Sequence, residues 1–237
     1  MIQLYRVTVR FPNGIEALRE VTVRVHEGEL AFVSGRSGAG KTTLVRLVTA
    51  HQAPTDGQIL VAGRNLAVMK AAQLPFFRRG IGTLWQDVRL LPDRSVRDNV
   101  ALPLEIVGVD PKKLRHRVDQ VLEMVGLERL ADAAPAWLSA LEKQKAGIAR
   151  AIVNEPALIV ADEPTGDLDP ESAVAIVQML RDLRARGTTV LIATHDRQIL
   201  QRFGERVILL NKGFLIEDTA AGAAPREARG PVGEAQP

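Results

Sequence analysis

Apolar residues along the chain follow two different periods. In the first part they recur at every second position, as at 7–11 and 21–25, with turn-forming residues at 12–14 and 26–29 between the runs. Such alternation is typical of strands that bury one face. An entirely apolar run at 30–33 then predicts a short strand that is buried on both faces. The N-terminal part is therefore predicted to consist of half-buried strands that lead into a fully buried strand.

Helical spacing replaces this alternation in the middle third. Asp110 followed by a proline predicts a helix start, and Gly126 predicts the end of that helix. The basic residues at 112–117 are interpreted as its solvated face, with a nucleic-acid patch as the alternative. We predict that residues at about 88–150 form an inserted helical subdomain. The apolar positions that recur at helical spacing are Leu114, Val118, Val121, Leu122 and Val125.

The last third alternates apolar strands with a helix. The runs at 157–161 and 188–193 are apolar enough to be buried on both faces, and Asp169 with the following proline starts a capped helix between them. These elements predict an α/β fold with a parallel-sheet core covered by helices. The folded domain is predicted to span residues 1–217. Residues 218–237 are rich in Ala, Gly, Pro and Glu and are predicted to be a disordered tail.

Composition is that of an ordinary folded protein. Apolar residues make up 46% and charged residues 25% of the 237 positions, which is enough apolar material for a large core. The absence of cysteine excludes disulfides and thiol chemistry. There is no apolar run of membrane-spanning length and no pattern of a secretion signal, so the chain is expected to stay in the cytoplasm. The net charge of +3 favours a mixed solvated surface over nucleic-acid binding.

A glycine-rich phosphate-binding motif is the strongest chemical signal. The letters GRSGAGKT at 35–42 fit G-x-x-x-x-G-K-[ST] and lie between a predicted strand and a predicted helix. Glycines let backbone N–H groups surround phosphate oxygens, and the helix N-terminus favours the same anion. Lys41 is expected to reach the β- and γ-phosphates, and Thr42 to ligate Mg²⁺. The expected nucleotide-binding residues of this segment are Gly35, Arg36, Ser37, Gly38, Ala39, Gly40, Lys41, Thr42 and Thr43.

An acidic pair follows the apolar run at 157–161. Asp162 and Glu163 stand at the end of a predicted buried strand, where carboxylates cost free energy unless they have a function. Asp162 is expected to hold Mg²⁺ through water, and Glu163 to polarise an attacking water. Together with the phosphate-binding motif, this pair indicates hydrolysis of a nucleoside triphosphate.

In the order and spacing of these motifs, residues 1–217 resemble the nucleotide-binding subunits of ATP-binding-cassette (ABC) systems. The resemblance implies a P-loop NTPase of the ABC type, which has a RecA-like parallel-sheet core, an N-terminal antiparallel β subdomain and an inserted helical subdomain. It also implies ATP and Mg²⁺ as cofactors. It implies that Gln86 senses Mg²⁺ and a membrane partner, and that His195 contacts the γ-phosphate. Phe11 falls where the family stacks an aromatic residue on adenine, with core packing as the alternative. The match at 165–169 implies a loop that crosses the interface of a homodimer.

Narrower features are similar to one branch of this family, the FtsE-type ATPases of bacterial cell division. They lie at 74–79, 93–104 and 189–196. This resemblance implies an integral membrane partner of the FtsX type, attachment to the cytoplasmic face of the inner membrane through that partner, and control of peptidoglycan hydrolysis. An ABC transporter ATPase, a lipoprotein-release ATPase and a poorly hydrolysing, ATP-gated scaffold remain as alternatives. An apolar cluster beside Gln86 is either the docking surface for the partner or part of the core. It consists of Trp85, Val88, Leu90 and Leu91.

The signature motif of the family is altered. The pattern L-S-G-G-[EQ] falls on LSALE at 138–142, so that Ala140 and Leu141 replace both glycines. The resemblance implies that Ser139 donates to the γ-phosphate held by the opposite subunit. Ser139 and Glu142 still form a capping-box pattern, so the helix start is expected to survive. Normal ATP binding within one subunit is expected, with closure or hydrolysis weakened by the Leu141 side chain and by backbone strain if these positions require a positive φ.

Overall fold

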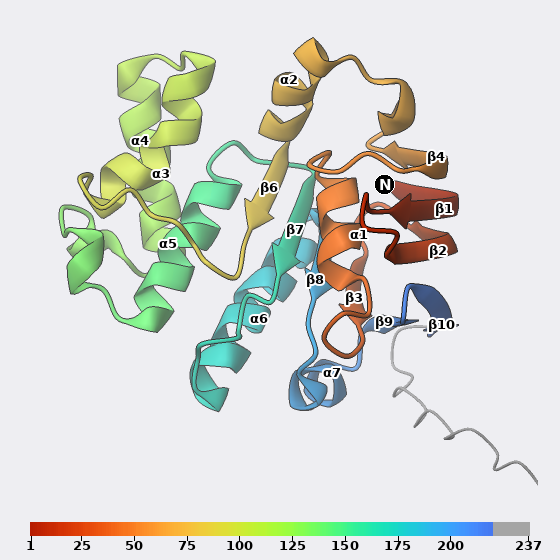
Figure 1. Cartoon of the computed structure of the whole chain (residues 1–237). Coiled ribbons are helices and arrows are strands. Elements are labelled where there is room, and N and C mark those ends of the chain that lie inside the picture. The colour runs from red at the N-terminus through yellow and green to blue at the C-terminus, as the bar shows by residue number, and fades with distance from the viewer. Residues whose placement is uncertain (220–237) are drawn as a thin grey trace, which may run out of the picture.

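The structure is a computed structural model that describes residues 1–219. The N-terminal strands form a four-stranded antiparallel sheet in the order β2-β1-β4-β5 (Figure 1). Their alternating buried and exposed positions confirm the predicted antiparallel subdomain. Its strands are β1 (Ile2–Arg10), β2 (Glu16–Val25), β4 (Asp56–Val61) and β5 (Arg64–Asn65).

A second sheet of six strands has the order β10-β9-β3-β8-β7-β6. All its neighbouring strands are parallel except the edge strand β10, which is antiparallel to β9. The central strands are buried at every position, as their continuous apolar runs predict. The strands are β3 (Leu30–Ser34), β6 (Ile81–Leu84), β7 (Leu158–Asp162), β8 (Thr189–Ala193), β9 (Arg206–Asn211) and β10 (Phe214–Asp218).

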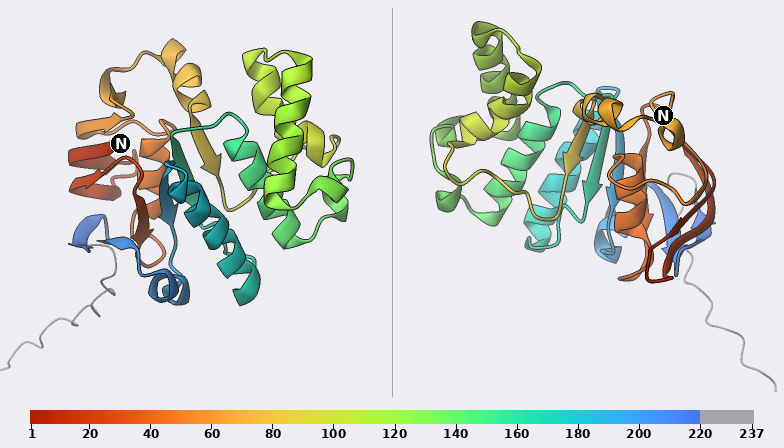
Figure 2. Two further views of the ribbon diagram at one scale, coloured as in Figure 1. Left: turned by 180° about the vertical axis from the view of Figure 1, so that it is seen from behind. Right: turned by 45° about the horizontal axis from the view of Figure 1, so that its top comes forward.

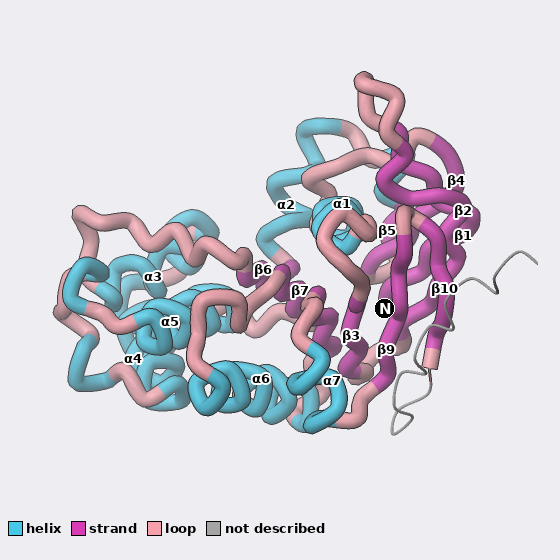
Figure 3. Tube along the Cα trace, turned by 60° about the horizontal axis from the view of Figure 1, so that its bottom comes forward, coloured by secondary structure: helices cyan, strands magenta, loops and turns pink. Residues whose placement is uncertain are grey.

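Helices cover both faces of the six-stranded sheet. Alternate side chains of β7 enter two apolar clusters: Ile159 packs with α6, whereas Val160 packs with α1 and the four-stranded sheet. Figure 3 shows α1 and α6 on opposite sides of the sheet. The fold is therefore the predicted α/β class. The helices are α1 (Lys41–Val48), α2 (Leu74–Arg79), α3 (Val96–Val107), α4 (Pro111–Val125), α5 (Ala140–Ile152), α6 (Pro170–Ala185) and α7 (Arg197–Phe203).

Helices α3, α4 and α5 pack against one another at the end of the molecule opposite the four-stranded sheet (Figures 1 and 2). The predicted caps define both ends of α4 and the start of α5. Asp110 accepts hydrogen bonds from the Lys112 and Lys113 backbone N–H groups at the start of α4, and Gly126 ends it in a left-handed conformation. At α5, Ser139 and Glu142 form the capping box. Local sequence signals therefore locate both ends of α4 and the start of α5 correctly.

The C-terminal end of the described chain differs slightly from the prediction. Asp218, the first residue of the predicted tail, is the last residue of β10, and the Thr219 N–H donates to the Val207 carbonyl. The rest of the predicted tail, 220–237, lies outside the described residues. Within the described part of the chain, none of the helices combines the length and the apolar character needed to cross a bilayer.

Candidate functional site

The phosphate-binding loop joins β3 to α1, as its motif predicts. Gly40 caps α1 with φ 110°, and a Cβ there would lie 2.5 Å from the Ala17 carbonyl oxygen. A Cβ on Gly35 would lie 2.3 Å from the carbonyl oxygen of Leu210. Real Cβ atoms do not approach backbone oxygens so closely, so both positions require glycine. The loop shape therefore depends on β2 and β9 as well as on its own sequence.

Lys41 is a nearly buried cation inside this loop. Its side chain is 8% exposed, its Nζ donates to the Gly35 carbonyl at 2.9 Å, and it lies 3.3 Å from Glu163 Oε1. A second carbonyl, that of Arg36, lies 3.5 Å away. A buried ammonium group needs such partners because water cannot solvate it. These partners hold the Lys41 ammonium group inside the phosphate-binding loop, where an anion can approach it.

Glu163 brings three functional groups together at the end of β7. Its backbone is left-handed, with φ 47°, and its N–H donates to the Ala193 carbonyl at 2.8 Å. This turn places Oε1 2.9 Å from His195 Nδ1 as well as beside Lys41. The His195 side chain is 67% exposed and so remains accessible. The predicted catalytic carboxylate and the predicted γ-phosphate contact are therefore neighbours.

Thr42 and Asp162 form a second polar pair next to this cluster. Thr42 Oγ1 donates to Asp162 Oδ1 at 3.3 Å. Burial raises the pKa of the Asp162 carboxyl, and the smaller effect of the Thr42 hydrogen bond lowers it. Residues 1–219 contain no group of three acidic or histidine side chains able to enclose a metal. A hydroxyl and one carboxylate suit Mg²⁺, which keeps several waters and takes phosphate oxygens as its other ligands.

Two cavities flank these groups. The first, about 670 Å³, is lined by Phe11, by the loop from Ser37 to Thr43, and by Glu163 and His195. Phe11 is half-buried and also packs against the apolar cluster of the four-stranded sheet, so adenine stacking and core packing are both compatible with its position. Gly35 and Arg36 do not line this cavity and contribute their carbonyl groups to Lys41 instead.

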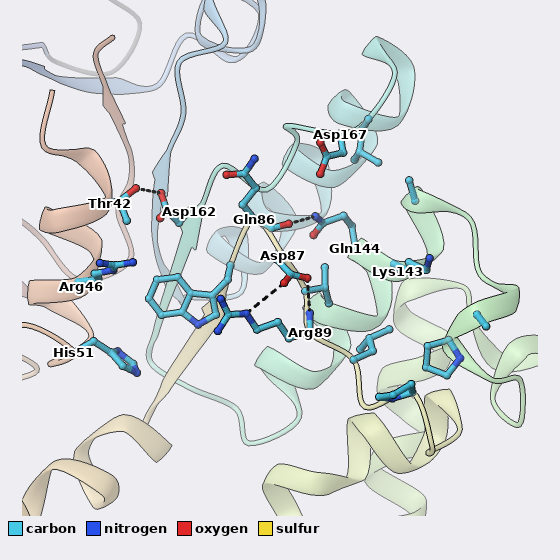
Figure 4. Close-up of a pocket in the computed structure, with 18 residues that line it drawn as sticks. Thr42, Arg46, His51, Gln86, Asp87, Arg89, Lys143, Gln144, Asp162 and Asp167 are labelled. Atoms are coloured by element: carbon cyan, nitrogen blue, oxygen red, sulfur yellow. Dashed lines mark hydrogen bonds and ion pairs between the residues drawn. The ribbon is translucent and has the colours of Figure 1, made fainter. Parts of the chain in front are cut away.

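The second cavity, about 970 Å³, lies between α1, the segment after β6 and the start of α5 (Figure 4). Thr42 and Gln86 line both cavities. A Cβ built on Gly166 would lie 3.4 Å from Gln86 Nε2, which places the amide of Gln86 beside the turn that follows Glu163. Side chains of both charges and of apolar character line this second cavity: Arg46, Trp85, Asp87, Val88, Arg89, Leu90, Lys143, Asp167 and Leu168.

Ser139 alone among the predicted site residues lines neither cavity and makes no contact with Lys41. Its Oγ donates to Glu142 Oε2 at 2.7 Å and accepts from the Glu142 backbone N–H. Ala140 and Leu141 begin α5 without a positive φ, so the condition under which backbone strain is expected at these positions is not met. The reason is that α5 starts at Ala140 with ordinary helical geometry. The Leu141 side chain is partly buried against the core cluster.

Gln144, a buried polar side chain in the wall of the second cavity, was not predicted from the sequence. The available signal was its spacing on α5. Gln144 falls three residues after Leu141 and four before Ile148, so it occupies a position of the apolar stripe. A polar residue on a buried stripe indicates a specific hydrogen bond, because an unpaired amide would destabilise the fold.

The fold and the site define a P-loop ATPase with an antiparallel β subdomain and a helical subdomain. A family model described as ABC transporter matches residues 18–166, and the chain belongs to this family of ATP-binding proteins. It is an ATP hydrolase of the ABC type.

Within this family, the chain is similar to individual proteins of bacterial cell division and to solved ATP-binding cassettes. The chain is 41% identical over 222 residues to the cell division ATP-binding protein FtsE of Bacillus subtilis (strain 168), covering 94% of this chain and 97% of that one. It is 42% identical over 215 residues to the protein of the same name from Escherichia coli (strain K12), covering 91% and 97%. Its structure is similar to that of the dimeric ATP-binding cassette MJ0796 in a post-hydrolysis state with ADP and Pi, with a TM-score of 0.85, 33% identity, and coverage of 93% and 99%.

Proposed function

We propose that this chain is the ATP-driven subunit of a bacterial cell-division complex of the FtsEX type. In this role it moves an FtsX-like membrane protein and thereby regulates peptidoglycan hydrolysis. The observation that carries the proposal is the similarity to FtsE proteins along almost the whole of both chains. The intact arrangement of Lys41, Glu163 and His195 supports the use of ATP in this role.

In this proposal each side chain of the site has a separate role in ATP hydrolysis. Bound Mg²⁺, held by Thr42 and Asp162, would neutralise charge on the phosphate oxygens. Lys41 binds the β- and γ-phosphates, and Glu163 accepts a proton from the attacking water and orients it. His195 donates to Glu163 Oε1 through Nδ1, and its other ring nitrogen is available to the γ-phosphate. Gln86 faces the same cavity from the segment after β6.

A homodimer completes the site in this proposal. Ser139 lines neither cavity of its own subunit, which is compatible with a role toward the nucleotide of the opposite subunit. The similar cassette MJ0796 is dimeric in its post-hydrolysis state. The nucleotide-binding domain is proposed to span 1–217, with the helical part at about 88–150 contributing Ser139 across the interface.

The second cavity is the proposed docking surface for the membrane partner, through which the chain attaches to the cytoplasmic face of the inner membrane. Its lining combines Trp85 and Leu90 with exposed charges such as Arg89 and Asp87, as interfaces with proteins do. Gln86 lies in the wall that this cavity shares with the nucleotide cavity. Of the predicted apolar cluster, Val88 is buried and belongs to the core, whereas Leu90 is only partly buried.

The function is tested on the purified chain and on its complex. Wild-type protein is expected to hydrolyse Mg·ATP. Glu163→Gln is expected to bind ATP with similar affinity but to lose turnover by at least about 100-fold, because the water loses its base. Turnover that survives in Glu163→Gln at the wild-type rate would contradict the assigned role.

The identity of the partner is tested by purification from membranes. An FtsX-like protein is expected to co-purify with the wild-type chain, and recovery of a transporter permease instead would favour the transporter alternative. Leu90→Asp is expected to lose this partner and to keep ATP binding. Loss of ATP binding as well would show that Leu90 serves the core.

A further inference from the structure

The wall of the second cavity contains a buried polar side chain to which the proposed function gives no role. Gln144 lies on α5 and is 6% exposed. Its Nε2 donates to the backbone carbonyl of Gln86 at 3.4 Å, as Figure 4 shows, and its Oε1 has no hydrogen-bond partner within residues 1–219. Burying an incompletely paired amide costs free energy, and a leucine or methionine would fill the same space without that cost. The bond to Gln86 is therefore what distinguishes this residue from a packing residue.

Helix α5 contacts the segment after β6 at two more positions, Arg150 and Gly147. The guanidinium of Arg150 donates to the carbonyl oxygens of Arg89 and Val88. One turn earlier, a Cβ on Gly147 would lie 2.7 Å from side-chain atoms of Leu84 and Val88, so α5 and this segment are in close contact. The backbone from Gln86 to Arg89, which follows β6, is thus hydrogen-bonded to α5 at three of its carbonyl groups.

The backbone carbonyl and the side chain of Gln86 face different parts of the molecule. Its backbone carbonyl is held by Gln144 on the side of α5. Its side chain lines the nucleotide cavity with Glu163 and His195. Because α5 begins at the Ser139 cap, Gln144 connects the helix that carries Ser139 to the residue that faces the catalytic carboxylate.

We propose that Gln144 is a positioning residue for Gln86. By holding the Gln86 carbonyl on α5, it makes a displacement of α5 move the Gln86 amide relative to Glu163. The inference rests on the proposed function, since it assumes that the cavity with Glu163 turns over ATP. If Gln144 served packing alone, a side chain of equal size without an N–H donor would replace it without effect on turnover.

The test uses the full chain in a Trp137→Phe background. Trp137 is 84% exposed, and its removal leaves Trp85, the neighbour of Gln86, as the single tryptophan. Gln144→Met keeps the size and removes the donor. We expect it to lower kcat about five- to tenfold, as the loss of one buried hydrogen bond would, to leave KM for ATP within about twofold, and to suppress the change in Trp85 fluorescence on adding Mg·ATP. Lys145→Met, at the next position of α5, is the matched control and is expected to behave as the background protein.

A second variant separates hydrogen bonding from packing. Gln144→Glu cannot donate to the Gln86 carbonyl while its carboxylate is ionised, but it donates again once protonated. Its kcat relative to the background protein is therefore expected to be low at mildly alkaline pH and to recover as the pH falls. Gln144→Met has no such group, so its relative kcat is expected to stay low across the same range.

Three results would overturn the proposal. They are a Gln144→Met protein with unchanged kcat and an unchanged Trp85 response, an equal loss in Lys145→Met, and relative activities of Gln144→Met and Gln144→Glu that follow the same pH profile. Thermal unfolding of each variant reports whether the fold is intact. Failure of the premise taken from the proposed function would be recognised separately, because the Trp137→Phe background protein itself would then not hydrolyse Mg·ATP.

Discussion

Glu163 shows how much of the site depends on one backbone conformation. Its left-handed φ of 47° directs the carboxylate to Lys41 and His195, whereas an extended residue would continue the line of β7. A non-glycine residue in this region is strained by about 1 kcal/mol or more. The neighbouring bonds, including that from the Glu163 N–H to the Ala193 carbonyl, hold it there.

The residues that replace the signature glycines give the first prediction. The double change Ala140→Gly and Leu141→Gly is expected to raise Mg·ATP turnover, because it removes the side chains next to Ser139 where another subunit would approach. It is also expected to reduce stability by about 1–2 kcal/mol, since glycine disfavours helices and Leu141 has apolar contacts. Turnover and thermal unfolding are measured together. Unchanged turnover would show that the replaced glycines do not limit the reaction.

At the scale of elements, carboxylate caps fix where the helices begin. Asp169 accepts hydrogen bonds from the backbone N–H groups of Glu171 and Ser172 at the first turn of α6. Bonds from Ser172, and then from Glu171, hold the pKa of the Asp169 carboxyl below its ordinary value. A carboxyl group whose pKa is lowered by folding stabilises the fold above its unfolded-state pKa. That contribution disappears as the pH falls through the folded-state pKa.

The second prediction follows from the lowered pKa of Asp169. Asp169→Ala is expected to lower the midpoint of thermal unfolding at neutral pH by removing the cap. The difference from wild type is expected to shrink as the solution is acidified, because the wild-type carboxylate is then protonated too. Asp169→Asn, which caps without titrating, is the control. A difference that stays constant down to acidic pH would contradict the assignment of the cap.

For the whole molecule, local signals in the sequence determined what could be predicted. The phosphate-binding loop, the acidic pair and the caps of α4, α5 and α6 are short patterns, and the structure places them as predicted. The role of Gln144 depends on α5 lying against the segment after β6, which no local pattern encodes. The family pattern has glycine where Ala140 stands, so the sequence leaves open whether this position needs a positive φ. The structure shows an ordinary helical backbone there.

The third prediction concerns the parts of the sheet that shape the phosphate-binding loop. The carbonyl of Leu210 on β9 lies against Gly35, so the loop depends on a strand that comes after every motif residue in the sequence. A chain ending at residue 204 is expected to lose ATP binding, although it keeps His195 and all earlier motifs. A chain ending at residue 219 is the control and is expected to bind normally. Equal ATP binding by both truncated chains would contradict this dependence.

The strand order also has a consequence for synthesis on the ribosome. Leu30 of β3 pairs with Val190 of β8, and Ala31 pairs with Arg206 of β9, so β3 receives both neighbours only after β8 and β9 have emerged. The four-stranded N-terminal sheet is free to assemble early, because its strands are close in sequence. A nascent chain thus carries the complete phosphate-binding sequence at 35–42 before the strands that shape it, β8 and β9, have been made. Nucleotide binding is therefore expected only once β9 has been made and has paired with β3.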